Sequence, residues 1–209
     1  TAPVGKLLAR LALPAITAQV VNMLYNLGDR IYIGHIPTVG TQALTGVGVC
    51  FPLIMLVSAF AALVYSGGAP RASIAMGKGE NAEAERILGS CTALLLALSV
   101  ILTVVLTIWN RPLLLLFGAS EDTILYAEQY MNIYALGTLF VQAALGLNAF
   151  ITCQGFAKTS MLTVLIGAVI NTVLDPIFIF ALDMGVQGAA LATVISQGIS
   201  ALWVVRFLT

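Results

Sequence analysis

The chain of 209 residues contains very little charge. Only 9% of its residues are Asp, Glu, Lys or Arg, whereas a soluble globular protein carries roughly 25%, and this composition excludes a soluble domain. Basic and acidic residues balance at nine each, so no bulk charge would attract nucleic acid. Hydrophobic residues make up 60% of the chain. The composition therefore predicts a protein that crosses the membrane several times and contacts lipid.

Motifs for metal binding and catalysis are also missing. The single histidine, His35, and three cysteines show no spacing typical of a metal site or a disulfide framework. His35 is interpreted as a solvated loop residue, and Cys50, Cys91 and Cys153 as small buried hydrophobes. The chain has no HExxH, GxSxG or phosphate-binding loop sequence. The sequence thus predicts neither an enzyme nor a protein with a cofactor.

Long apolar runs predict an all-α membrane bundle of six helices that forms one lobe, because a spanning helix needs about 20 mostly apolar residues. The expected helices cover residues 7–33, 43–65, 87–109, 124–152, 160–181 and 186–208. The most polar connection is 66–86, where Asn81 is expected to cap the third helix, and Ser120 is expected to cap the fourth. No cleavage site follows the first run, so a signal peptide is not expected.

Lysine and arginine are unevenly divided between the two sides of this bundle. Six crossings place both ends on one side, and Arg111 alone lies on the other. The residues on the side of the ends are Lys6, Arg10, Arg71, Lys78, Arg86, Lys158 and Arg206. Because short cytoplasmic loops are rich in these residues, both ends are predicted to be cytoplasmic, in a multi-pass protein of the plasma membrane.

Two carboxylates lie inside the expected spans, Asp29 in the first and Asp175 in the fifth. A charge at the bilayer centre costs about 2.5–3.5 kcal/mol on insertion scales, so its default role is functional. The structural alternative is a salt bridge, most obviously with Arg30. Adjacent residues point in different directions on a helix, however, and Arg30 is near enough to the interface for its side chain to reach water.

Each carboxylate is accompanied by polar residues at helical spacing. Gln19, Asn22 and Asn26 precede Asp29 at intervals of three and four, which places all four on one face. Such a face must be turned to protein or to a water-filled cavity. The alternative for each asparagine is a hydrogen bond that only holds helices together. The face is interpreted as a polar cavity lining.

The fifth expected helix adds an amide and a proline. Asn171 lies one turn before Asp175, and Pro176, which directly follows, frees the carbonyl of Thr172. Asp29 and Asp175 both lie within about 10 Å of helix ends on the same side of the membrane. Asp29, Asp175 and Asn171 are therefore a possible Na⁺ site, or a site where a carboxyl group binds a proton. Asn148, Thr193 and Gln197 are weaker polar candidates in other spans.

Several segments resemble the multidrug and toxic compound extrusion (MATE) family. They include LPAITAQVVNMLYNLGDRIYIG, TQALTGVGVCFP, SGGAPRASIAMGKGENAEAERILG, PLLLLFGASEDTILYAEQYMNIYALG, NAFITCQGFAKTSM and NTVLDPIFIFALDMGVQGAALATVISQ. The resemblance covers nearly the whole chain in order, but only the first half of such a transporter. It implies the N-terminal lobe of a twelve-helix protein, with a second six-helix lobe as partner.

Members of this family export organic cations and other amphipathic compounds in exchange for H⁺ or Na⁺. The resemblance implies that the coupling ion depends on a cluster in this lobe, made of Asp29, Asp175, Asn171, Asn148 and Thr193. Arg30 departs from members that carry a small or hydroxyl residue there. In this interpretation the first helix bends at Pro14 or Gly28, and Pro176 is a third hinge candidate.

Two other functions remain open. A flippase for lipid-linked precursors would have the same broad fold, but it should carry more cations in its cavity than Arg30 alone. A membrane scaffold subunit would tolerate replacement of both carboxylates. The sequence does not distinguish H⁺ from Na⁺.

Overall fold

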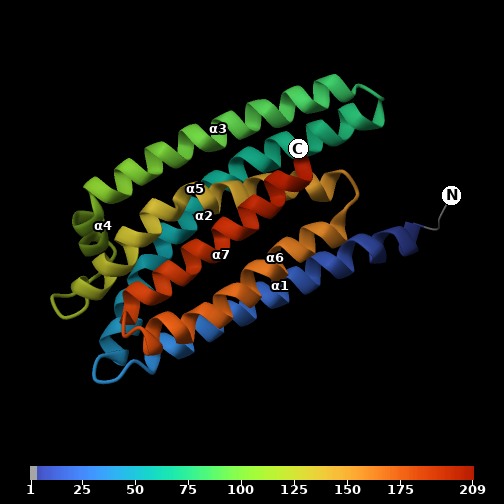
Figure 1. Ribbon diagram of the computed structural model, residues 1–209. Helices are drawn as coiled ribbons and strands as arrows, with labels where there is room; N and C mark the ends of the chain where they lie inside the picture. Colours follow the sequence, from blue (N-terminus) through green and yellow to red (C-terminus); the bar gives the residue numbers. More distant parts are fainter. Residues whose placement is uncertain (1–3) are drawn as a thin grey trace.

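The computed structural model describes residues 4–209 of the chain, except for the side chains of residues 4 and 6–11. The side chains of Lys6 and Arg10 therefore lie outside the described part. Every regular element in that part is helical (Figure 1). The elements are α1 (Val4–Gly34), α2 (Gly40–Gly77), α3 (Asn81–Ile108), α4 (Asn110–Leu116), α5 (Ile124–Cys153), α6 (Ala157–Pro176), a π-helical turn (Ile177–Ala181) and α7 (Gly185–Leu208).

The long helices run up and down in one elongated bundle (Figure 1). Helix α5 packs most extensively against α7, α2 and α3, whereas α1 packs mainly on α6. The bundle thus consists of a group formed by α2, α3, α5 and α7, with α1 and α6 paired along one flank. Both ends of the described chain lie at the same end of the bundle (Figure 1), as the alternation of spans requires.

Five helical segments are long and apolar enough to cross a membrane: α2, α3, α5, α6 with its π-helical turn, and α7. Helix α1 has 31 residues, a length of about 46 Å, which exceeds the roughly 30 Å hydrocarbon core of a bilayer. The described part of α1 is not among those five segments. Helix α1 carries the polar face identified from the sequence. The chain is a multi-pass α-helical membrane protein.

Helix α2 is longer than the sequence predicts. Residues 66–77, expected to be a loop, continue the helix through Pro70 to Gly77. The reason is packing: Ala69 and Ala72 are buried, and a Cβ at Gly68 would overlap the sulfur of Cys91 on α3. Close contact with α3 and α5 therefore outweighs the low helix propensity of this segment.

Both predicted helix caps are wrong. Asn81 is already inside α3, and Glu80 stands at its N-cap without a side-chain hydrogen bond. Ser120 lies before a turn in which its backbone N–H donates to Oγ1 of Thr123 at 3.0 Å, and α5 begins only at Ile124. Consecutive polar residues there gave several equivalent starting points for a helix, so sequence alone did not select one.

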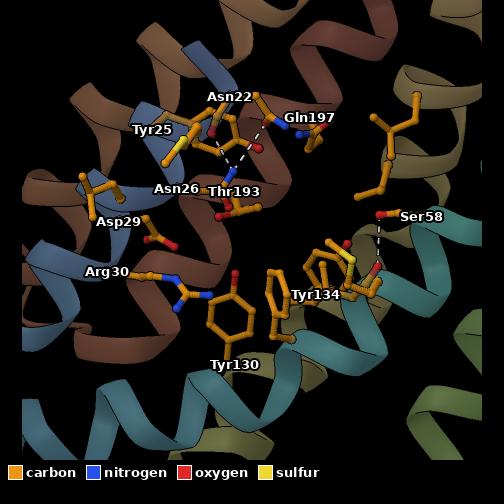
Figure 2. A pocket seen from close by; sticks show the side chains of 17 residues that line it. Asn22, Tyr25, Asn26, Asp29, Arg30, Ser58, Tyr130, Tyr134, Thr193 and Gln197 are labelled. Atoms are coloured by element: carbon orange, nitrogen blue, oxygen red, sulfur yellow. Dashed lines mark hydrogen bonds between the residues drawn. The ribbon is translucent and has the colours of Figure 1, made fainter. Parts of the chain in front are cut away.

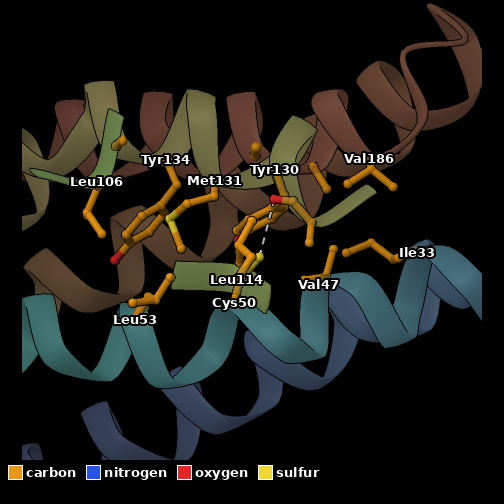
Figure 3. Packing of buried hydrophobic residues seen from close by; sticks show 14 of the residues in the cluster. Ile33, Val47, Cys50, Leu53, Leu106, Leu114, Tyr130, Met131, Tyr134 and Val186 are labelled. Carbon is orange, nitrogen blue, oxygen red and sulfur yellow. Dashed lines mark hydrogen bonds between the residues drawn. The ribbon is translucent and has the colours of Figure 1, made fainter. Parts of the chain in front are cut away.

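The main apolar core lies between α2, α5 and α7 and includes residues of α3 and α4 (Figure 3). Cys50 and Leu53 of α2 meet Met131 and Tyr134 of α5, all at most 3% exposed. The thiol of Cys50 donates to the carbonyl oxygen of Ala127 at 3.4 Å, in agreement with its predicted buried role. This core holds α2, α5 and α7 as one unit and leaves α1 outside it, except near Ile33.

Candidate functional site

A cavity of about 420 Å³ lies between α1, α2, α5 and α7, and we call it the first cavity (Figure 2). Helix α1 contributes its polar face to it. The other walls are mainly aromatic and apolar, with Tyr130 and Tyr134 of α5 stacked at 6.2 Å between ring centroids. The polar residues of α1 that line it are Asn22, Tyr25, Asn26, Asp29 and Arg30. The cavity therefore combines charged groups with aromatic surface.

Asp29 projects from α1 into this cavity. Its Oδ1 atom is buried and has no hydrogen-bond partner among the described residues. The neighbouring Arg30 does not form a salt bridge with it: the two ion pairs of the described chain are Arg86–Glu83 and Arg111–Glu128. The salt-bridge alternative for Asp29 thus has no support in the geometry.

Asp175, Asn171 and Thr193 lie together where α6 meets α7. Asp175 is fully buried, and its Oδ1 accepts a hydrogen bond of 3.2 Å from the amide of Asn171. The same amide lies 3.5 Å from Oγ1 of Thr193, which lines the first cavity. Asp29 lines the same cavity as Thr193, and no hydrogen bond joins it to Asp175 among the described residues. We call these four residues the carboxylate cluster.

The carboxylate cluster has an excess of hydrogen-bond acceptors. Oδ2 of Asp175, Oδ1 of Asn171 and Oδ1 of Asp29 are all buried without a donor among the described residues. A buried polar atom without a partner costs about 1–3 kcal/mol. Binding a proton or a small cation would satisfy such acceptors, so the arrangement is chemically suited to either.

Asn148 lies apart from the carboxylate cluster. Its amide donates to the backbone oxygen of Ser160 at 3.2 Å, and it lines a second cavity of about 330 Å³ between α1, α5, α6 and α7. Gln19 also lines this second cavity, while Asn22 and Gln197 line both. The predicted polar residues thus divide between two adjoining cavities. Among the described residues, no hydrogen bond joins Asn148 to Asp29 or Asp175.

The hinge candidates differ in their local structure. Helix α1 continues unbroken through Pro14 and Gly28, so neither position is a break in this conformation. Pro176 ends α6 and is followed by the π-helical turn, where the backbone N–H of Leu182 donates to the oxygen of Ile177 at 2.9 Å. The predicted irregularity at Pro176 is therefore present, directly beside Asp175.

Several cavity residues were missed in the sequence. Tyr25 occurs three residues after Asn22 and four before Asp29, so the helical spacing that revealed the polar face also included this phenol. Tyr130 and Tyr134 of α5 are four apart, which is a weaker signal, since aromatic pairs at this spacing are common in cores. Ser58 of α2 also lines the first cavity, but no pattern in the sequence indicated it.

A family model described as MatE matches residues 14–177. An FAD transporter of Shewanella oneidensis is 26% identical over 94% of the chain and 44% of its own length. The multidrug export protein MepA of Staphylococcus haemolyticus is 26% identical over 97% of the chain and 44% of its own length. The chain thus spans less than half of these relatives.

Solved structures have the same fold. A structure named "protein A" matches with a TM-score of 0.93 and 36% identity, over 99% of this chain and 46% of that one. An outward-facing multidrug resistance MATE family transporter of the MOP superfamily matches with a TM-score of 0.90 and 29% identity, over 97% of this chain and 44% of that one. The match again covers one half of a larger bundle.

Proposed function

Because the chain belongs to the MatE family, whose relatives here are named as transporters or export proteins rather than enzymes, we propose that it is one lobe of a secondary active exporter. Its substrates are organic cations or other amphipathic compounds, exchanged for H⁺ or Na⁺. The chain matches about 44% of each relative. A second six-helix lobe would complete the transporter.

The observation that carries this proposal is the carboxylate cluster with its unpaired acceptors. Its Asp29 and Thr193 line the first cavity, while Asp175 is fully buried. An ion bound to these groups would change the charge of the cavity wall. The same groups would therefore control both ion binding and the electrostatic attraction of a cationic substrate.

The physical requirement for coupling is that the ion binds two conformations with different affinities. Helix α1 is the element best placed to move, since of its described side chains only Pro14 and Ile33 are buried. A shift of α1 toward α6 or away from it would change the distance between Asp29 and Asp175. For Na⁺, the ligands would be oxygens of Asp29, Asp175 and Asn171; for H⁺, one carboxyl group suffices.

The location follows from the same reasoning. The described basic residues Arg71, Lys78, Arg86, Lys158 and Arg206 lie near one end of the bundle, and Arg111 lies near the other. The positive-inside rule places the first end in the cytoplasm. We propose that the lobe sits in the plasma membrane with both of its ends cytoplasmic.

The test is efflux of a cationic dye by the complete transporter in liposomes, with pH and Na⁺ gradients imposed separately. Asp29→Asn and Asp175→Asn should each reduce gradient-driven efflux by about tenfold or more, because they remove the charge that changes on ion binding. Asp183→Asn is the matched control. Asp183 is exposed, has a φ of 52°, and asparagine tolerates this left-handed conformation.

Undiminished gradient-driven efflux in both cluster variants would disprove the coupling role. It would favour the scaffold alternative, in which neither carboxylate is needed. A lipid-linked precursor flippase is less consistent with the first cavity, because Arg30 is the single basic residue among the described residues that line it.

A further inference from the structure

Arg30 lines the first cavity and forms no ion pair with any residue that the structure describes. Its side chain is exposed to the cavity that it lines, and Figure 2 shows it extending from α1 toward Tyr130. The two ion pairs of the described chain are formed by Arg86 and Arg111, near the helix ends. Because this guanidinium group faces an open cavity rather than lipid, its N–H donors are available to a ligand.

The position of Arg30 is fixed by an aromatic ring. The Arg30 guanidinium carbon lies 5.3 Å from the centroid of the Phe51 ring on α2, within the range of a cation–π contact. A cation–π contact uses no hydrogen bond, and Arg30 forms no side-chain hydrogen bond with the described residues, so its N–H donors are available. Those donors match the two oxygens of a carboxylate or phosphate group.

The surroundings of Arg30 suit a flat, unsaturated ligand. The stacked rings of Tyr130 and Tyr134 form the adjacent wall, and Phe51 forms another. Aromatic faces of this kind pack against ligand rings in offset or edge-on geometry. A simple organic cation would use these rings and Asp29, but it would be repelled by Arg30.

We propose that Arg30, held on Phe51 beside Tyr130 and Tyr134, is an oxyanion-binding residue that selects aromatic compounds carrying a carboxylate or phosphate group. The inference rests on the proposed transport function and narrows its substrate class. Asp29 and Arg30 then have opposite effects on substrate charge: Asp29 attracts the cationic part of a ligand and Arg30 the anionic part.

The experiment compares two dyes that share a xanthene ring system but differ in charge, anionic fluorescein and cationic rhodamine 123. Their binding to the complete transporter in phosphatidylcholine nanodiscs is measured by fluorescence anisotropy. Arg30→Gln should weaken fluorescein binding by about tenfold or more, the usual effect of losing a charge-assisted hydrogen bond. It should tighten rhodamine 123 binding, because a repelling charge is removed.

Further variants make the test specific. Arg30→Lys should restore part of the fluorescein affinity, and Asp29→Asn should raise it by removing the adjacent negative charge. Arg111→Gln is the matched control, since Arg111 pairs with Glu128 at 3.0 Å outside the first cavity, and it should change neither dye. Should Arg30→Gln fail to fold, Phe51→Leu replaces it and should weaken fluorescein binding about threefold by removing the aromatic support.

Three results would overturn the inference. Absence of fluorescein binding to the unmodified transporter, or equal binding in Arg30→Gln, would show that Arg30 does not recognise anions. Displacement of fluorescein by phosphatidylglycerol, lost in Arg30→Gln, would show that the site takes a lipid headgroup instead. Gradient-driven efflux of rhodamine 123 is measured in parallel: if it persists, the proposed function stands although this inference has failed, and if it is absent, the proposed function has failed separately.

Discussion

Helices α5 and α1 both run the length of the bundle, but they are held in place very differently. Half of the 30 residues of α5 are buried against its neighbours, whereas only Pro14 and Ile33 are buried among the described side chains of α1. The core between α2, α5 and α7 is filled with apolar side chains, while α1 borders both cavities with amides and charges. The difference indicates a rigid unit with one movable wall.

The largest effect on the free energy of unfolding should come from replacing a leucine by alanine in the core, compared with the same replacement in α1. Leu53→Ala, at a core position that is 1% exposed, should lower the unfolding free energy by about 2 kcal/mol or more, because it leaves a cavity. Leu24→Ala in α1, at a position 60% exposed, should change it by less than about 0.5 kcal/mol. Thermal unfolding in detergent measures both. Equal losses would mean that α1 is packed as firmly as α2.

A smaller effect on stability is expected from removing one interhelical hydrogen bond. Its dependence on ions should distinguish a bond that only holds helices together from one that takes part in ion binding. Thr103 donates to the oxygen of Ala135 at 3.0 Å between α3 and α5, and Thr103→Val should cost about 0.6 kcal/mol. Thr193→Val removes an acceptor of Asn171 in the carboxylate cluster and should cost about as little. Only Thr193→Val should alter how the melting temperature depends on pH and Na⁺.

The melting temperatures of both threonine variants are read at two pH values and two Na⁺ concentrations. If Thr103→Val shifted the ion dependence as strongly as Thr193→Val, the ion response would be a property of the whole bundle. The distinction between the rigid unit and the movable wall would then no longer account for coupling.

The smallest effects on the free energy of unfolding should come from removing the ion pairs at the helix ends. Glu83→Gln removes the Arg86–Glu83 pair, whose atoms are 4.0 Å apart and whose side chains are 81% and 52% exposed, and should change stability by less than about 0.5 kcal/mol. Glu128→Gln removes the shorter 3.0 Å pair with Arg111 and should cost up to about 1 kcal/mol. Chemical denaturation checks both, and a loss of several kcal/mol would show that surface charge, rather than packing, fixes the rigid unit.

The sequence predicted the membrane class and the all-α bundle because lipid imposes a simple rule: long apolar runs must be helices. Helical spacing likewise revealed the polar face of α1 and the pairing of Asn171 with Asp175. Contacts between helices were not predictable in the same way. The extension of α2 depends on the fit of Gly68 against Cys91, and the placement of Asn148 depends on its contact with Ser160 of α6. Neither of these contacts between helices produces a recognisable residue pattern within one segment of the sequence.

Both ends of the described chain lie at one end of the bundle (Figure 1), and this has a topological consequence. A unit with an even number of crossings preserves its orientation when it is duplicated in tandem, because the copy starts on the side where the original stops. The link between the copies never has to pass through lipid. Loss of one crossing would reverse everything downstream, so selection would act on such units in whole pairs of helices.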